Sequence, residues 1–195
     1  MTITPWGYGI DGQLPALITV EDFDYATGRR WAGDARVLPA IDAVSAAIRS
    51  YCGWHVGPSC ACEMELDGEP GDIWLPVAHL TSVEGAQVDG EDVGVAGFNR
   101  RGRVRLACAI PRGLGNVTVS FTAGIPVEGA YDLQMAVADA VVGIIALDSY
   151  GVASETAGGV SISYSGSALS SQGMLLPGNV RAALAPYKVV RSHAA

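Results

Sequence analysis

The chain has few basic residues for its length. Lys and Arg total 12 of its 195 residues, against 20 Asp and Glu, so the formal net charge is −8 at pH 7 and the pI is near 4.7. A protein that binds nucleic acid through its overall charge needs a basic surface. The composition therefore disfavours that class, although a local basic patch can still contact phosphate.

Long apolar runs are also missing. No run of 18 apolar residues occurs, and the most apolar stretch, 133–147, contains Gln134 and Asp139, so no membrane-spanning helix and no membrane partner are predicted. Residues 1–14 lack the basic and apolar regions of a secretory signal. We therefore expect the four cysteines to lie in a reducing cytosol, where structural disulfides are rare.

The common catalytic motifs are absent. The sequence has no P-loop, no Gly-x-Gly-x-x-Gly and no Gly-x-Ser-x-Gly element. Nucleophilic catalysis needs a positioned base, and none of the three histidines belongs to a Cys–His signature. We predict a protein that is not an enzyme, with no catalytic residue and no cofactor. A small hydrolase is the weaker alternative, which a pocket gathering His79 with acidic residues would favour.

One cluster resembles a metal site. Cys52, His55, Cys60 and Cys62 combine thiols and an imidazole, the groups that bind zinc tetrahedrally. The spacing is not that of a familiar zinc finger, and Cys-x-Cys is tight for two ligands of one ion. The alternative is that Cys52 is buried at a helix end and Cys62 in a strand. We assign no metal ligand and keep a zinc-binding module as an alternative function.

Periodicity predicts helices at both ends of the chain. Thr19 is a candidate N-cap for a short helix, and a second helix ends near Tyr51 at Gly53. Its residues Ile41, Val44 and Ile48 fall on one face. Later in the chain, Asp132 is expected to cap a third helix that reaches about Tyr150, and Pro177 to open a last short helix.

Residues 60–125 show the alternation of short strands. About five strands are expected, with turns at Asp67-Gly68 and Asp89-Gly90. The sequence therefore predicts an α+β fold, in which a helical frame of three to four helices carries an inserted small antiparallel β-barrel or sandwich. We expect residues 16–56 and 130–191 to form the helical domain with its C-terminal loop and tail, 60–125 the β-module, and 1–15 an N-terminal arm.

Charge is unevenly distributed in the predicted β-module. No Lys or Arg occurs from 50 to 99, where nine acidic residues lie, and five arginines follow within 100–112. We hypothesise a head-to-tail subunit contact, since such contacts close into rings and charge complementarity sets their register. The alternative is a solvated face of an ordinary strand pair. The candidate interface residues are Glu63, Glu65, Arg100, Arg101, Arg103 and Arg105.

A second candidate contact lies in the Gly- and Ser-rich segment 151–173. Val160, Ile162 and Tyr164 alternate with serines, as in a strand, but no hairpin partner is evident. Such a strand is suited to adding onto the sheet edge of a partner. The alternative is a strand of a small sheet of its own.

The order of motifs resembles the head–tail connector family of tailed bacteriophages, also called adaptor or head-completion proteins. The strongest match is the Ala-rich stretch 41–56, which ends in Tyr-Cys-Gly-Trp-His. The resemblance spans about residues 16–188. Supporting matches are Asp22-Phe23, Thr27-Gly28-Arg29, Leu75-Pro76, Ser82-Val83, Val88-Asp89-Gly90, Thr122-Ala123-Gly124, 151–155 and Leu184-Ala185-Pro186-Tyr187.

This resemblance implies a structural protein of the virion neck, present in the host cytoplasm during assembly. It implies a homo-oligomeric ring, expected as a dodecamer, that docks under the portal protein and extends the DNA channel. The ring would help to retain packaged DNA and attach a tail or stopper protein. DNA would pass without sequence-specific binding, which an acidic wall favours because it repels phosphate. The implied portal or neighbour contacts are Val160, Ile162, Tyr164, Tyr187, Lys188 and Arg191.

Overall fold

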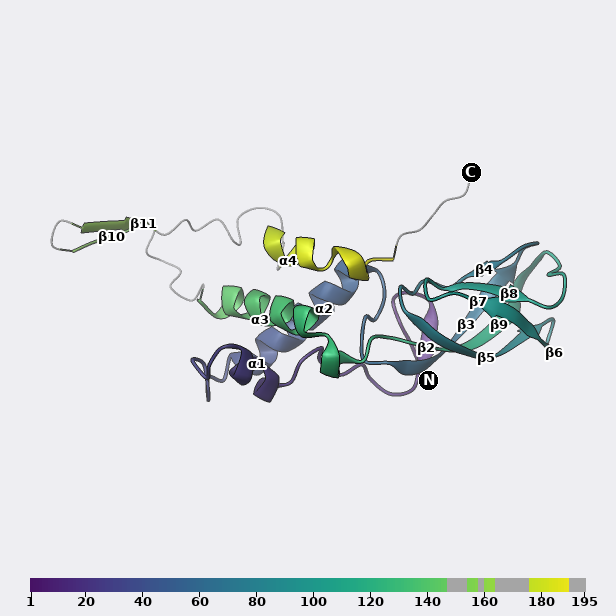
Figure 1. Cartoon of the computed structure of the whole chain (residues 1–195), viewed down its shortest axis with the longest axis horizontal. Coiled ribbons are helices and arrows are strands. Elements are labelled where there is room, and N and C mark those ends of the chain that lie inside the picture. Colours follow the sequence, from purple (N-terminus) through teal and green to yellow (C-terminus); the bar gives the residue numbers. More distant parts are fainter. Residues whose placement is uncertain (147–153, 158–159, 164–175, 190–195) are drawn as a thin grey trace. The chain divides into compact units, whose positions relative to one another are not determined.

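The computed structural model describes residues 1–146, 154–157, 160–163 and 176–189. Contacts divide the chain into two units, each built from separate stretches of sequence (Figure 1). The β unit consists of residues 1–15, 49–130 and 186–195, and the helical unit of 16–48 and 131–185. The predicted N-terminal arm thus contributes strands to the β unit.

The β unit contains two antiparallel sheets. The six-stranded sheet has the order β1 (Thr2–Ile3), β2 (Tyr8–Ile10), β3 (Cys60–Gly68), β9 (Gly113–Ala123), β5 (Leu80–Val88) and β6 (Glu91–Val93). The three-stranded sheet has the order β4 (Ile73–Trp74), β8 (Arg103–Leu106) and β7 (Val95–Phe98). The 3-10 helices η1 (Val127–Gly129) and η3 (Ala185–Tyr187) complete the irregular segments.

Alternation along the strands creates the core of the β unit. In β9 the residues Val117, Val119 and Phe121 are buried, while the residues between them are partly exposed. In β8, Val104 and Leu106 are buried between exposed arginines. Each sheet therefore has a buried face that contributes to the core and an exposed face.

The helical unit contains α1 (Val20–Ala26), α3 (Tyr131–Ala146), α4 (Gly178–Ala183) and most of α2 (Val37–Cys52). Thr19 is the N-cap of α1, as expected from the sequence, and it forms a capping box with Asp22. Ile41, Val44 and Ile48 of α2 are fully buried on one face. No helix among the described residues is long and apolar enough to cross a membrane.

The α+β prediction is confirmed, since helices and two antiparallel sheets occur together, and the sheets do not close into a barrel. Two local predictions are wrong. Asp132 lies inside α3 rather than capping it. The chain does not turn at Asp67-Gly68, because the amide side chain of Asn116 accepts from the Gly68 N–H (2.8 Å) and extends the β3–β9 pairing to Gly113.

Another correction concerns residues 160–164. The strand β11 (Val160–Ser163) does have a hairpin partner, β10 (Ser154–Ala157), with which it pairs antiparallel. Val160 lies opposite Ala157, and Ile162 lies opposite Glu155. Tyr164 lies outside the described residues. The partner was missed because Ser-Glu-Thr-Ala has no apolar alternation.

Candidate functional site

A buried polar centre lies where the segment after α2 meets β2 and β3. His55 is fully buried, and its Nδ1 lies 2.7 Å from the Tyr8 hydroxyl. The same hydroxyl accepts from the His55 backbone N–H (3.1 Å), and the His55 Nε2 lies 3.0 Å from the Ala123 carbonyl oxygen. Burial raises the pKa of the Tyr8 phenol above its usual range. Tyr8 therefore stays neutral and fixes the orientation of the imidazole ring.

Arg49 supports the same centre from the last turn of α2. Its guanidinium donates to three backbone carbonyls, those of Pro15 (2.6 Å), His55 (2.9 Å) and Gly57 (2.8 Å). Burial lowers its pKa, because a charged group loses its hydration there. A planar group with five donors is well suited to tie together carbonyls from separate segments. Arg49 thus holds the loop that carries His55.

The thiols of Cys60 and Cys62 lie beside this ring. The two Sγ atoms are 3.9 Å apart, and the Cys60 Sγ lies 3.7 Å from the His55 Nε2. The ligand atoms of all three residues lie within 4.8 Å of one another. The hydrogen bond from Cys62, then the contact with His55, lower the pKa of the Cys60 thiol to about 5. Cys62 holds the shared proton, so its own pKa is raised.

Three of the four residues that the sequence grouped therefore come together. Cys52 is buried at the end of α2, where burial raises its pKa to about 12, and it is not part of the cluster. Cys62 is buried in β3, as expected in the alternative to a metal site. His79, the residue on which a hydrolase would depend, contacts the Gly124 carbonyl oxygen through Nδ1 (3.0 Å).

Glycine at position 124 allows the close approach of the β9 end to this centre. Its φ of +123° is rare for other residues, and a Cβ there would overlap the backbone of Pro58 and Ser59. A Cβ would also lie 2.8 Å from the His55 Nε2. The Ala123–Gly124 backbone is therefore packed directly against the cysteine–histidine cluster.

An acidic surface covers the exposed face of the six-stranded sheet. Glu63 and Glu65 alternate outward along β3. Glu84, on β5, is also exposed and accepts from the Thr122 hydroxyl (2.7 Å). Ser120, opposite Glu63 on β9, is only 3.5 Å from its carboxylate. We call Glu63, Glu65 and Glu84 the acidic face.

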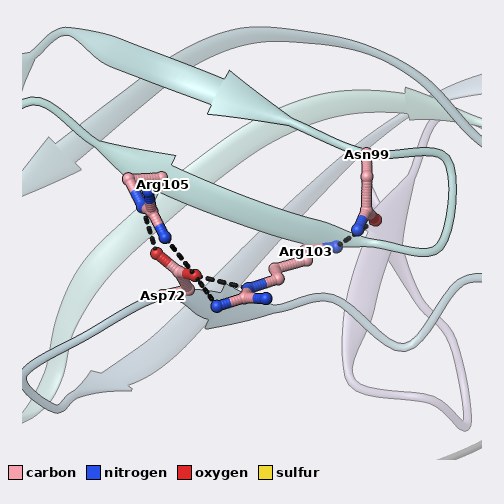
Figure 2. A network of polar contacts seen from close by, with 4 residues as sticks. All are labelled: Asp72, Asn99, Arg103 and Arg105. Atoms are coloured by element: carbon pink, nitrogen blue, oxygen red, sulfur yellow. Dashed lines mark hydrogen bonds and ion pairs between the residues drawn. The ribbon is translucent and has the colours of Figure 1, made fainter.

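The exposed face of the three-stranded sheet is basic, but two of its arginines are already paired. Figure 2 shows the Asp72 carboxylate between the guanidinium groups of Arg103 and Arg105. Arg105 makes two contacts with it, at 2.7 and 3.1 Å, and Arg103 also lies over the Trp74 ring. These bonds, with that of Arg105 foremost, lower the pKa of Asp72.

Arg100 and Arg101 lie in the tight turn between β7 and β8 and are exposed. Asn99 shapes this turn, because its side-chain oxygen accepts from the backbone N–H groups of Arg101 (2.9 Å) and Arg103 (3.2 Å). Figure 2 shows the contact between Asn99 and Arg103. We call Arg100 and Arg101 the basic turn. The acidic face and the basic turn belong to different sheets of the β unit.

The C-terminal segment is held against the end of α2. The Trp54 indole N–H donates to the Tyr187 carbonyl (2.6 Å), and the Val189 N–H donates to the Cys52 carbonyl (3.0 Å). The Lys188 ammonium lies over the Tyr51 ring, 4.4 Å from its centre. We call this segment, 187–189, the C-terminal strap. It contains two of the predicted contact residues, Tyr187 and Lys188, while Arg191 lies outside the described residues.

Sequence reasoning missed Tyr8, Arg49 and Asp72. Tyr8 lies in a segment that was expected to be an arm, and Asp72 was counted only as one of nine acidic residues. Arg49 had a usable signal, because a charged residue lies two positions before the Tyr-Cys-Gly-Trp-His motif on the buried side of an amphipathic helix.

A family model described as "Head completion protein" matches residues 16–190. Among solved structures, the chain is similar to one from the neck of a native GTA particle computed with C12 symmetry, with a TM-score of 0.58 and 19% identity over 96% of this chain and 98% of the other. At that identity the likeness supports the fold. No curated protein matches the chain.

Proposed function

Because the chain belongs to the head completion protein family, whose model covers residues 16–190, we propose that it is a ring-forming subunit of a virion neck. In this role it connects the head to the tail, and its work is structural rather than catalytic. The family match is the observation that carries the proposal. The similarity in fold to a structure from a particle neck computed with C12 symmetry supports a ring of twelve copies.

The charge distribution of the β unit supports a head-to-tail contact within this ring. A heterologous interface needs two different, complementary surfaces on each subunit. The acidic face and the basic turn supply opposite charges on different parts of the same unit. Since Arg103 and Arg105 already share Asp72 within the chain, the exposed Arg100 and Arg101 are better placed to meet Glu63 and Glu65 of the next subunit.

The ring would continue the DNA channel below the portal protein. A net charge of −8 per subunit disfavours tight contact with phosphate, so a duplex can pass without being held. Val160 and Ile162 of the β10–β11 hairpin, and the segment around Tyr187 and Lys188, are proposed as contacts with the portal or a neighbouring subunit. A tail or stopper protein would bind the opposite end.

The first test is disruption of the gene in the genome that encodes the chain, followed by imaging of the particles. A connector predicts DNA-filled heads that leak their contents and carry no tails, and a plasmid copy of the gene should restore tailed particles. Normal tailed particles after disruption would refute the neck assignment. If disruption instead produced only empty heads, the defect would lie in DNA packaging, and this result would also contradict the neck assignment.

The second test addresses the interface. Arg100→Glu with Arg101→Glu should prevent ring assembly on portal rings at moderate salt, and Glu63→Arg with Glu65→Arg should do the same. A variant carrying all four changes should assemble again, because the charges are exchanged but still complementary. If all three variants assembled as well as the wild type, this contact would be excluded. Arg103→Glu with Arg105→Glu serves as the matched control and should have the smaller effect.

A further inference from the structure

The cysteine–histidine cluster has the arrangement of a small metal site. Its three candidate ligands come from two segments: His55 from the loop after α2, and Cys60 and Cys62 from the start of β3. All three belong to the β unit. Cys60 and Cys62 are two residues apart on a strand, so both point to the same face of the sheet as His55.

The distances fit the edges of a zinc tetrahedron. Zinc lies about 2.3 Å from sulfur and about 2.0 Å from nitrogen, which places two sulfurs about 3.8 Å apart and sulfur and nitrogen about 3.6 Å apart. The observed distances are 3.9 Å between the two Sγ atoms and 3.7 Å between the Cys60 Sγ and the His55 Nε2. The third edge, between the Cys62 Sγ and the His55 ring, lies within 4.8 Å and must shorten when an ion binds.

Zinc binding would change the hydrogen bonds of the ring. A metal-binding histidine usually has its other ring nitrogen fixed by a hydrogen bond. In the structure the His55 Nε2 donates to a backbone carbonyl, so the Nδ1 accepts from the Tyr8 hydroxyl 2.7 Å away. Zinc at Nε2 requires the ring proton to move to Nδ1, where the Tyr8 hydroxyl can accept from it. The competing partner of Nε2 is the Ala123 carbonyl at 3.0 Å, so ion binding exchanges that hydrogen bond for a metal bond.

A disulfide between the two thiols is a poorer fit. Residues two apart on an extended strand have Cα atoms about 6.7 Å apart, at the limit that a disulfide can span. Strand β3 is held in that conformation by pairing of Cys60 with Ala123 and of Cys62 with Phe121 on β9. An ion between the sulfurs requires no such shortening of the strand.

We propose that His55, Cys60 and Cys62 bind one zinc ion, with water as the fourth ligand. Zinc is chosen because two thiolates and one imidazole form a set that it prefers. Cys60 is only half-buried, which provides the route of entry for the ion and the position for the water. The ion would fasten the loop before β3 to the strand itself and stabilise the β unit independently of ring assembly.

Metal analysis of the full chain tests the site. Protein produced with zinc in the medium and dialysed should contain about one zinc per chain, as expected for a single site. Cys60→Ser and Cys62→Ser should lose it, whereas Cys108→Ser, which changes an exposed cysteine, should retain it. After removal of metal with a chelator, added zinc should raise the melting temperature of the wild type and of Cys108→Ser but not of Cys60→Ser.

Cobalt substitution keeps the test decisive if a cysteine variant fails to fold. Co²⁺ added to metal-free wild-type protein should produce thiolate-to-cobalt absorption, which zinc then abolishes. Folded wild-type protein without this absorption, or with the same zinc content as Cys60→Ser, overturns the proposal. The proposal is also overturned if the purified protein contains no metal and a thiol titration shows that two of its cysteines are oxidised. None of these outcomes bears on the role in the neck.

Discussion

The β unit contains two polar clusters that differ in burial. Around Arg49 and His55, every polar group is enclosed and bonded to backbone or to Tyr8. Around Asp72, two exposed arginines share one largely covered carboxylate near the surface. Removing a partner from a buried cluster leaves polar groups that neither protein nor water can hydrogen-bond. Exposed ion pairs contribute little, because water solvates each charge when the pair is broken. The buried cluster should therefore contribute most to the stability of the β unit, and the cluster around Asp72 should matter more for the binding of partner proteins.

The largest effect is expected from Arg49→Met. This change removes the donor to three carbonyls, two of them buried, and should lower the free energy of unfolding by about 3 kcal/mol. Urea denaturation measures it. Arg100→Met, which removes an exposed guanidinium, is the matched control and should change stability little. If both variants have the same stability, the distinction between the two clusters is wrong.

Tyr8→Phe should have the next largest effect. The ring keeps its packing against Phe121, but the His55 N–H and the imidazole lose their common partner. We expect a loss of about 1–2 kcal/mol in the free energy of unfolding. Tyr25→Phe, at a fully solvated position, controls for the loss of a hydroxyl. A loss in Tyr25→Phe equal to that in Tyr8→Phe would argue against a role for the buried hydrogen bonds.

Trp54→Phe should act mainly on the C-terminal strap. It removes the donor to the Tyr187 carbonyl and part of a fully buried side chain, and it should lower the free energy of unfolding by about 1–2 kcal/mol. Hydrogen exchange at Val189, whose N–H bonds to the Cys52 carbonyl, should become faster than in the wild type. Unchanged exchange at that amide would mean that the strap is held by other contacts.

Asp72→Asn should have the smallest effect on stability. The pKa of Asp72 is lowered in the folded protein, so its ion pairs stabilise the fold above the carboxyl's ordinary pKa of about 3.9 and are lost as the pH falls through the folded value. The small difference in stability between wild type and variant should therefore be present at neutral pH and shrink on acidification. A difference that grows on acidification would contradict the ion-pair assignment.

The elements with strong local signals were predictable from the sequence. The N-cap at Thr19 and the buried face of α2 depend on residues three or four positions apart, and both are confirmed. The turn at Asp89-Gly90 is also present, with positive φ at both residues. In each case the information lies within one turn of helix or one hairpin.

The buried centre was predictable only in part. The Cys-x-Cys and Cys-x-x-His spacings drew attention to four residues, but only the fold shows that Cys52 points elsewhere and that His55 faces the strand. His55 contacts Tyr8, which lies 47 positions away in the sequence, and Ala123, which lies 68 positions away. Pairing over such separations is decided by tertiary packing, which local periodicity does not encode. The same reason explains why β2 and the partner of β11 were missed.

The chain passes between its two units four times, after residues 15, 48, 130 and 185. Neither unit is therefore a continuous stretch of the gene. A single recombination event between related genomes would join half of one unit to a foreign half, so the two units should be inherited together, and laboratory chimaeras should exchange three segments at once to obtain a foldable β unit.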